Sequence, residues 1–233
     1  MYSKRRLLLA VVACGLALTA CSSSNSALAS SSRLWESKLL KTCSGKANTN
    51  STLSIQSKAT ISGANIAFTR SCLLEIDGGS LTIDSSNLKV ATLGVVLGAN
   101  SNLIIKSSEI TGLNPSASLS VSSSGAGQTV QLANDKINIF RGILVEVGLG
   151  YPPTKGVHDF SVTNSKIVAS SPSGVGIELI SRGKSKFSND VMSTAANGGV
   201  PEIETSSPSS CRIYKVKGFH STRCTKLAVS PGG

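Results

Sequence analysis

A short phrase with strand periodicity recurs along the chain and constrains its fold more than any other feature. The phrase alternates apolar with other residues, continues with small polar residues and ends on an apolar one. Its second apolar residue falls at positions 83, 105, 132, 162 and 187, so successive copies are 22, 27, 30 and 25 residues apart. Such periods are typical of solenoids, and the alternation predicts that each coil is mostly strand. The copies are LTIDSSNL from Leu81, LIIKSSEI from Leu103, VQLANDKI from Val130, FSVTNSKI from Phe160 and a degraded SKFSNDV from Ser185.

The composition agrees with one elongated domain. Aromatic residues make up 4% of the chain, and Ser, Gly and Asn separate short aliphatic runs. A stack of narrow coils filled by aliphatic side chains needs no aromatic core. The alternative is a β-sandwich, but hairpin turn signals are scarce, because only Asp77-Gly78 and Asn197-Gly198 qualify.

The coils can be traced over residues 48–225. A second apolar strand precedes the phrase in each later copy, and about seven coils result. At about 4.8 Å per strand they predict a rod of roughly 30 to 35 Å. Before the rod, residues 33–41 are predicted to form one amphipathic helix, with Trp35 and Leu39 on a shared face. This helix, within a cap of residues 33–47, is expected to close the first coil, and residues 226–233 form a C-terminal tail.

The N-terminus has the pattern of a bacterial export signal. Three basic residues at positions 4–6 precede an apolar stretch that is too short for a typical membrane span. The stretch ends in Leu-Thr-Ala before Cys21, which is similar to a lipoprotein cleavage site, so residues 1–20 would be removed and Cys21 lipidated. Residues 21–32 then form a Ser-rich tether. Cleavage before Cys14 or after Ala29 remains an alternative, and the second would release a secreted protein.

The remaining cysteines fit an exported protein. With Cys14 removed and Cys21 lipidated, four are left, an even number in an oxidising compartment. Proximity in the sequence favours two disulfides, one at each end of the repeats. No spacing among these cysteines is typical of a metal site, so we expect them to bind no metal. The favoured pairs are Cys43 with Cys72 and Cys211 with Cys224.

The chain resembles the right-handed parallel β-helix proteins of the pectin lyase-like superfamily. The resemblance rests on the 22-residue coils and on Asn134, Asn164 and Asn189, which align at one position of successive copies. Asn tolerates the left-handed backbone of a tight bend, and stacked amides can hydrogen-bond along the axis. The resemblance covers roughly residues 48–220 and implies an all-β, single-stranded, right-handed solenoid. It does not imply one activity, because the superfamily includes lyases, hydrolases, epimerases, adhesins and binding proteins.

An enzyme of this class would need acidic residues on an exposed strand face. Glu146 and Glu178 each lie between two apolar residues of a predicted strand, and aligned in this way they would stack about 5 Å apart. Glu202 or Glu204 could extend this ladder, and Asp77 would hold the matching position near the other end. Because like charges this close cannot all ionise at low cost, such a ladder would either bind a cation such as calcium or raise the pKa of one of its carboxyl groups. The chain lacks the paired Asp and Gly-His-Gly signatures of galacturonases and the calcium motifs of pectate lyases.

The charge balance predicts an anionic partner. Without Lys4, Arg5 and Arg6, the 23 basic residues become 20 against 12 acidic ones, a net charge of +8. On an exported protein this favours anionic glycans, phospholipid headgroups or lipopolysaccharide phosphates over nucleic acid. Residues expected to hold such a ligand are Tyr151 and Lys155 in an insertion between coils, and Arg182, Lys184 and Lys186 after the Glu178 strand. His158 and His220 are expected to lie at the surface or in an end cap.

These observations favour a lipid-anchored envelope protein that binds an anionic polysaccharide or another surface component without catalysis. It would face the periplasm or the exterior, on the outer membrane in a Gram-negative cell, and would need no cofactor. One alternative is a polysaccharide lyase, glycoside hydrolase or epimerase that uses Glu146 and Glu178, with Glu204 as a further candidate, together with Arg182 or Lys184. Another is an adhesin-like spacer. The sequence leaves the oligomeric state open.

Overall fold

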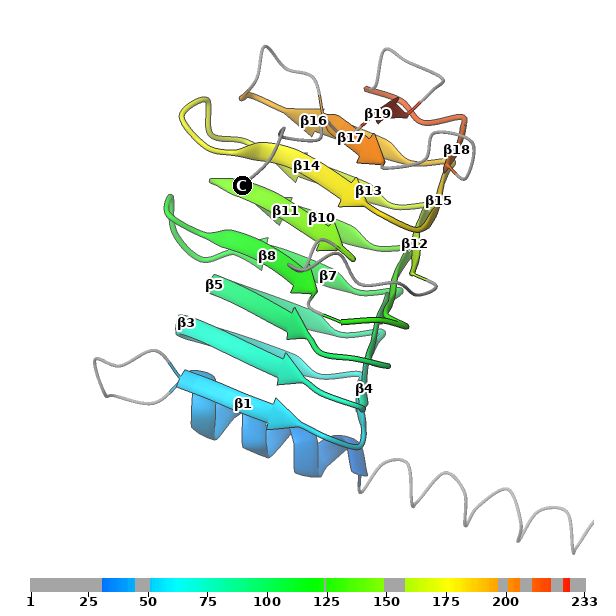
Figure 1. The fold of residues 1–233 in the computed structure, drawn as a ribbon. Coiled ribbons are helices and arrows are strands. Elements are labelled where there is room, and N and C mark those ends of the chain that lie inside the picture. The colour runs from blue at the N-terminus through cyan, green and yellow to red at the C-terminus, as the bar shows by residue number, and fades with distance from the viewer. Residues whose placement is uncertain are drawn as a thin grey trace, which may run out of the picture.

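The computed structural model is a parallel β-solenoid of about six turns, with one short helix before the strands (Figure 1). It describes residues 31–44, 51–123, 125–148, 158–196, 201–205, 211–218 and 224–226. The β-helix expected from the repeats is therefore confirmed. The coil count is about six rather than about seven, because the last coil is represented only by short strands. The residues of the predicted export signal, the predicted lipidation site Cys21 and most of the predicted tether lie outside the described residues.

The repeat phrase forms one sheet of seven parallel strands. Its copies pair residue by residue, so positions 83, 105, 132, 162 and 187 stack directly on one another, as the alignment of the copies predicts. We refer to this sheet as the seven-stranded sheet. Its strands are β2 (Lys58–Ser62), β4 (Ser80–Asp84), β6 (Asn102–Lys106), β9 (Thr129–Ala133), β12 (Asp159–Thr163), β15 (Lys184–Ser188) and β18 (Cys211–Tyr214).

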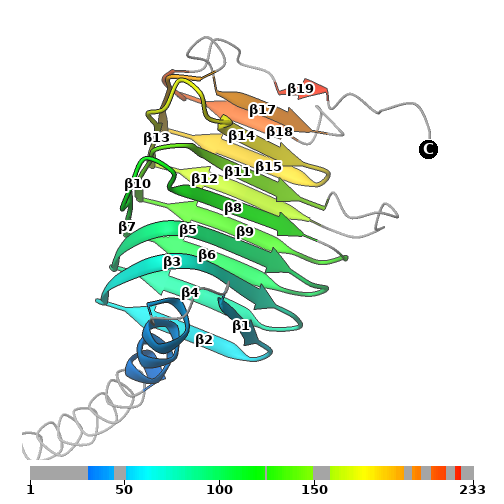
Figure 2. The same cartoon turned by 90° about the vertical axis from the view of Figure 1, so that its left-hand side faces the viewer.

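The other strands belong to a sheet of twelve that forms two faces of the coil (Figure 2). The two long strands β3 (Asn65–Ile76) and β5 (Asn87–Leu97) contribute to both, and their pairing shifts register at the bend. One face, called the β7 face here, contains the first halves of β3 and β5. It also contains the strands β7 (Glu109–Gly112), β10 (Lys136–Ile139), β13 (Lys166–Ala169) and β16 (Val191–Thr194). The β8 face contains β1 (Ser51–Ile55), the second halves of β3 and β5, β8 (Ser118–Ser123), β11 (Gly142–Val147), β14 (Gly176–Ser181), β17 (Glu202–Thr205) and β19 (Thr225–Lys226).

Aliphatic ladders fill the space between the three faces. In β4, β6 and β9 the inward residues are Leu or Ile or Val, and each is at most 2% exposed. Phe160 and Phe187 continue these ladders in β12 and β15, with ring centroids 5.4 Å apart in an edge-to-face arrangement. Burial of this continuous column is the main stabilising contribution to each coil, since no coil encloses a core of its own.

The corner between the seven-stranded sheet and the β7 face is built from residues with a left-handed backbone. Asn134, Asn164 and Asn189 have φ values of 58°, 53° and 58°. The Asn189 side-chain amide donates to Asn164 Oδ1 at 3.1 Å. The expected Asn stack at a tight bend is therefore confirmed, and Ser85 and Ser107 occupy the same position in earlier coils.

The next residue at this corner points inward and joins adjacent coils through hydrogen bonds. The backbone N–H of Ser108 donates to Asp135 Oδ1 at 2.9 Å, that of Asp135 donates to Ser165 Oγ at 3.2 Å, and that of Ser165 donates to Asp190 Oδ1 at 2.9 Å. Ser86 accepts in the same way from residue 64. Each side chain satisfies a buried backbone donor of the preceding coil, so this polar ladder fixes the register between coils.

The two ends of the stack are each held by a disulfide. At the first coil, the helix of residues 31–43 buries Trp35, Leu39 and Cys43 against the core, and Cys43 is bonded to Cys72. The described helix already includes residues 31 and 32, before the expected residue 33, and the Ser62 backbone N–H donates to Ser32 Oγ at 2.8 Å. At the last coil, Cys211 is bonded to Cys224. Both disulfides expected from proximity are confirmed.

The buried carboxyls of the polar ladder should make stability depend on pH. Burial raises the pKa of Asp135 and of Asp190 from 3.8 to about 6. Folding therefore favours the protonated forms, so their stabilisation is complete below about pH 4 and is lost as the pH rises through about 6. We expect the free energy of unfolding to fall over this range by up to about 3 kcal/mol per carboxyl. Urea unfolding at pH 4, 5, 6 and 7 measures this fall.

Replacing both carboxyls tests their role in the polar ladder. Asp135→Ser with Asp190→Ser inserts the residue used at Ser108 and Ser165 and should flatten the pH dependence. Ser165→Ala, which removes a ladder hydroxyl but no carboxyl, should lower stability about equally at every pH. An unchanged slope in the double variant would contradict the account.

Candidate functional site

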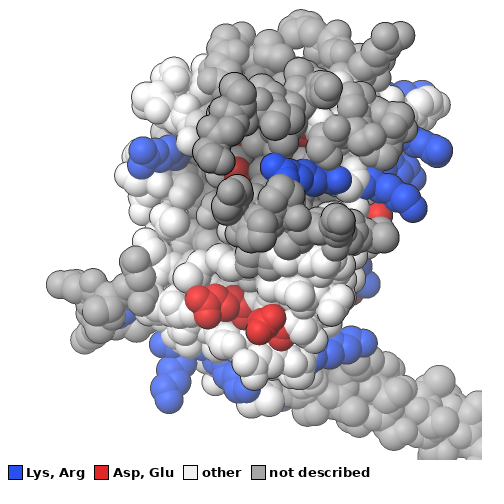
Figure 3. All heavy atoms as spheres, in the orientation of Figure 1, with Lys and Arg blue, Asp and Glu red and all other residues white. Residues whose placement is uncertain are grey.

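Acidic side chains of the β8 face gather near the C-terminal end of the rod. Its outward positions include Glu75 in β3, Glu146 in β11, Glu178 in β14, and Glu202 and Glu204 in β17. Figure 3 shows one acidic patch on this side of the molecule, toward the first coils, and most Lys and Arg side chains toward the margins. Glu146, Glu178 and Glu202 lie on the consecutive strands β11, β14 and β17, so their carboxylates are neighbours along the axis.

The register within this cluster differs from the expected one. Glu178 pairs with Leu144, and Glu146 pairs with Ile180, so these two glutamates are diagonal neighbours instead of a direct stack. The expectation matched Val145 with Ile177, whereas Val145 pairs with Leu179. A shift of two residues preserves the alternation of inward and outward side chains, and for this reason the alternation alone cannot detect it.

The other members of the expected ladder are also corrected. Glu202 pairs directly with Glu178, whereas Glu204 pairs with Ile180 and so lies in the column of Glu146. Asp77 follows the end of β3, and Glu75 is the carboxylate that lies on the strand there. The structure therefore places two columns side by side where one ladder was expected.

The glutamates nevertheless influence one another electrostatically. The pKa of Glu178 is raised by burial and then by the charges of Glu202 and Glu146. The pKa of Glu204 is raised by burial, by a hydrogen bond with Glu202, and by the charges of Glu202 and Glu178. In the described part of the chain, no three His, Cys, Asp or Glu side chains are grouped as a metal site requires.

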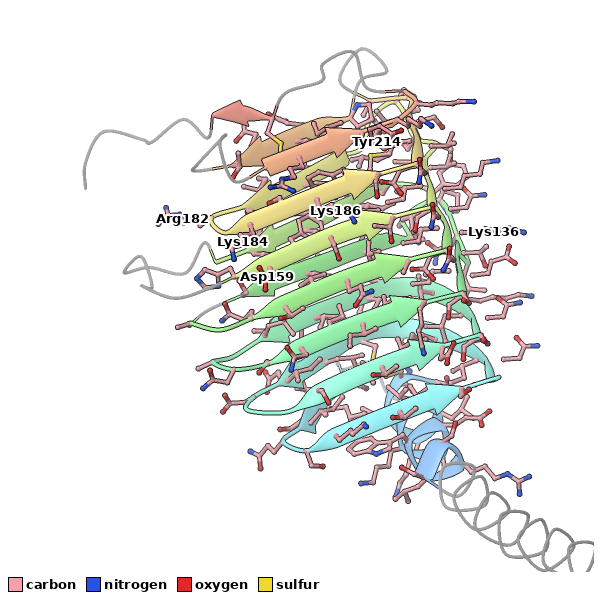
Figure 4. All side chains as sticks on the ribbon, turned by 90° about the vertical axis from the view of Figure 1, so that its right-hand side faces the viewer. Lys136, Asp159, Arg182, Lys184, Lys186 and Tyr214 are labelled. Carbon is pink, nitrogen blue, oxygen red and sulfur yellow. A yellow bond between two sulfur atoms is a disulfide. The ribbon has the colours of Figure 1, made fainter. Side chains whose placement is uncertain are left out.

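The basic candidates lie on a different face. Lys184 and Lys186 are exposed on β15 of the seven-stranded sheet, and Lys186 pairs with Arg212 on β18. Figure 4 shows Lys184 and Lys186 on this sheet and Arg182 at its edge. Lys184, Lys186 and Arg212 border a shallow groove across β12, β15 and β18. Its lining residues are Asp159, Phe160, Ser161, Lys184, Ser185, Lys186 and Arg212.

A corner of the coil separates these cations from the glutamates. The chain passes from β14 to β15 through Arg182 and Gly183, and the Arg182 backbone N–H donates to the Val147 carbonyl at 2.9 Å. Lys184 and Lys186 therefore do not share a strand face with Glu146 and Glu178. The combined acid and base site expected from the sequence is not formed by these residues. Tyr151 and Lys155 lie outside the described residues.

Two residues of the groove region were missed in the sequence. Arg212 and Tyr214 alternate with Ile213, so both point outward from β18. Tyr214 is 57% exposed, and Lys215 Nζ lies 5.0 Å from the centroid of its ring. The expected coils included this segment, but alternation over four residues did not by itself identify Arg212 and Tyr214 as ligand-binding residues.

His158 is buried, and the expected surface or end-cap position is wrong. The side chain is 1% exposed, and neither ring nitrogen has a hydrogen-bond partner within the part of the chain that the structure describes. Gly148 and Gly183 pack around it so closely that a Cβ on either would contact His158 at less than 3 Å. Since two coils enclose this residue, its role is in packing between them. His220 lies outside the described residues.

Comparison with known proteins assigns no family. No family model matches the chain, and no match was found among curated proteins or among solved structures. Among the described residues, no helix has the length and apolarity needed to span a membrane.

Removing one charge of the glutamate cluster should stabilise the protein at neutral pH. Glu202 contributes to the raised pKa of both Glu178 and Glu204, so Glu202→Gln should lower both. Because a raised carboxyl pKa costs stability as the pH rises, the variant should gain up to about 1 kcal/mol at pH 7 and little at pH 4. NMR titration of the carboxyl carbons and urea unfolding measure the two effects. Glu75→Gln on the same face is the control. An equal gain in stability in that variant would contradict the claim that repulsion within the glutamate cluster lowers stability.

Proposed function

We propose that this protein binds an anionic polysaccharide, without catalysis, at the C-terminal half of the seven-stranded sheet. The observation that supports this most directly is the groove bordered by Lys184, Lys186 and Arg212. Among the described residues none of these three side chains makes an ion pair, whereas Lys106 of the same sheet is paired with Asp84 at 3.1 Å. Their charges are thus available to a ligand.

The spacing of these groups suits an extended polyanion. Lys186 and Arg212 are directly paired on adjacent strands and so lie about 4.8 Å apart along the axis. Ser161 precedes Lys186 in the same column and offers a hydroxyl for a hydrogen bond. Carboxylate or sulfate groups carried on successive sugars could be bound by such a row, with Arg favouring bidentate contacts.

Tyr214 adds an aromatic surface beside these cations. Its side chain is 57% exposed, and it lies two residues after Arg212 in the same strand. An amphipathic ring of this kind can pack against the apolar face of a sugar while its hydroxyl remains in water. Charge and ring together therefore favour a glycan over a simple inorganic anion.

The cellular setting of the proposal comes from the N-terminal sequence. The basic and apolar pattern of residues 4–20 and the cysteine that follows favour export and lipid attachment at Cys21. The protein would then present its rod from an envelope membrane, or be secreted if cleaved after Ala29. The Asn stack and the parallel coils also support a relationship to the pectin lyase-like superfamily.

A catalytic alternative rests on the glutamate cluster. A carboxyl whose pKa is raised can act as a general acid, and both Glu178 and Glu204 have raised pKa values. If the protein were a lyase, hydrolase or epimerase, its reaction would take place on the β8 face. A spacer without a ligand is the remaining alternative.

Substitution of the groove cations tests the binding proposal. Lys186→Gln with Arg212→Gln removes two charge-assisted contacts, so affinity for polygalacturonate or heparin should fall at least about tenfold. Lys58→Gln, on the first strand of the same sheet, is the matched control and should change affinity less than twofold. Isothermal titration calorimetry at low and moderate salt measures both.

The same samples distinguish the alternatives. Reducing ends and unsaturated products are measured after incubation with each polysaccharide. Products that disappear in Glu178→Gln would replace the binding proposal by the catalytic one. No binding and no product would favour the spacer and contradict our proposal.

A further inference from the structure

The strand faces of the rod differ in charge. On the β8 face, the strands from β1 to β17 carry five glutamates and no Lys or Arg. On the seven-stranded sheet, five basic residues stand against two acidic ones, Asp84 and Asp159. The basic residues of that sheet are Lys58, Lys106, Lys184, Lys186 and Arg212. One molecule therefore carries an acidic and a basic surface of similar length.

The β8 face also carries aliphatic side chains among its outward positions. Leu73, Val96, Leu144 and Ile180 are partly exposed there. Leu144 pairs with Glu178, and Ile180 pairs with both Glu146 and Glu204. Outward aliphatic side chains beside charged ones are the combination that protein interfaces use, in which apolar contacts have a charged rim.

We propose that the β8 face of one molecule docks against the C-terminal half of the seven-stranded sheet of a second copy. Both surfaces belong to the same solenoid, so both repeat at the strand spacing of about 4.8 Å. Glu178 and Glu202 are directly stacked, and so are Lys186 and Arg212. Two molecules lying side by side can therefore form opposite-charge pairs in register.

This contact is heterologous, because two different surfaces meet. The resulting dimer retains one unoccupied acidic surface on one copy and one unoccupied basic surface on the other, so association continues beyond a dimer unless a ring closes. Charged pairs at the surface are screened at high salt, so the assemblies should dissociate there. The basic residues are those of the proposed polysaccharide site, so an anionic polysaccharide should compete with self-association.

Complementary variants test the docking directly. Glu178→Gln with Glu202→Gln removes charge from the acidic surface, and Lys186→Gln with Arg212→Gln removes charge from the basic one. Each variant alone should sediment as a monomer at a concentration where the wild type forms larger species in low salt. A mixture of the two should form dimers and nothing larger, because only one functional surface of each kind is present. Circular dichroism and thermal unfolding confirm that both variants fold.

Several outcomes would overturn the inference. These are a wild type that stays monomeric in low salt at every concentration, a mixture that stays monomeric, and a single variant that associates like the wild type. Polysaccharide binding separates this inference from the proposed function. The glutamate variant should bind polysaccharide as the wild type does, so loss of self-association with binding retained would leave the proposed function intact.

Discussion

The rest of the structure depends on hydrogen bonds between adjacent coils at the corner between the seven-stranded sheet and the β7 face. Each inward Ser or Asp of that corner accepts a backbone N–H from the coil before it, and the preceding residue adopts the left-handed backbone that turns the chain. A buried donor without its acceptor costs free energy, so a coil that slips out of register loses this bond. The aliphatic ladders supply most of the burial, but they tolerate such slips better than the polar corner does.

Register in turn places every outward side chain. Because strands of adjacent coils pair in register from the corner outward, insertions between strands do not disturb the columns. The segment between β11 and β12 is the longest connection, yet Asp159 still pairs with Thr129 and Lys184. The columns of Lys186 with Arg212 and of Glu178 with Glu202 follow from this arrangement. Surface chemistry thus depends on buried polar groups several ångströms away.

The fold was largely predictable from the sequence, because the buried positions of each coil require apolar residues, and these recur along the chain at regular spacing. The repeat phrase identified the strands of one sheet, the aligned Asn residues identified the corner, and cysteine proximity gave both disulfides. The charged surface was less predictable. Glu146 and Glu178 were aligned two residues out of register, since outward residues meet no packing constraint that distinguishes a shift of two.

Three other features needed the structure. Asp135 and Asp190 belong to a polar phrase in the sequence, but their inward direction depends on the left-handed residue before each. His158 lies next to an insertion, which suggested exposure, whereas two coils enclose it. Arg212 and Tyr214 became parts of a candidate site only through the pairing of β18 with β15.

Hydrogen exchange of the wild-type protein, with and without polygalacturonate, tests the central claim most directly. If the C-terminal half of the seven-stranded sheet is a binding surface, protection should increase in β15, β18 and the turn before β15. The β8 face should change little, and the polysaccharide should be recovered at its original length. Protection centred on β11, β14 and β17, with shortening of the polysaccharide, would contradict the account and assign the function to the glutamate cluster.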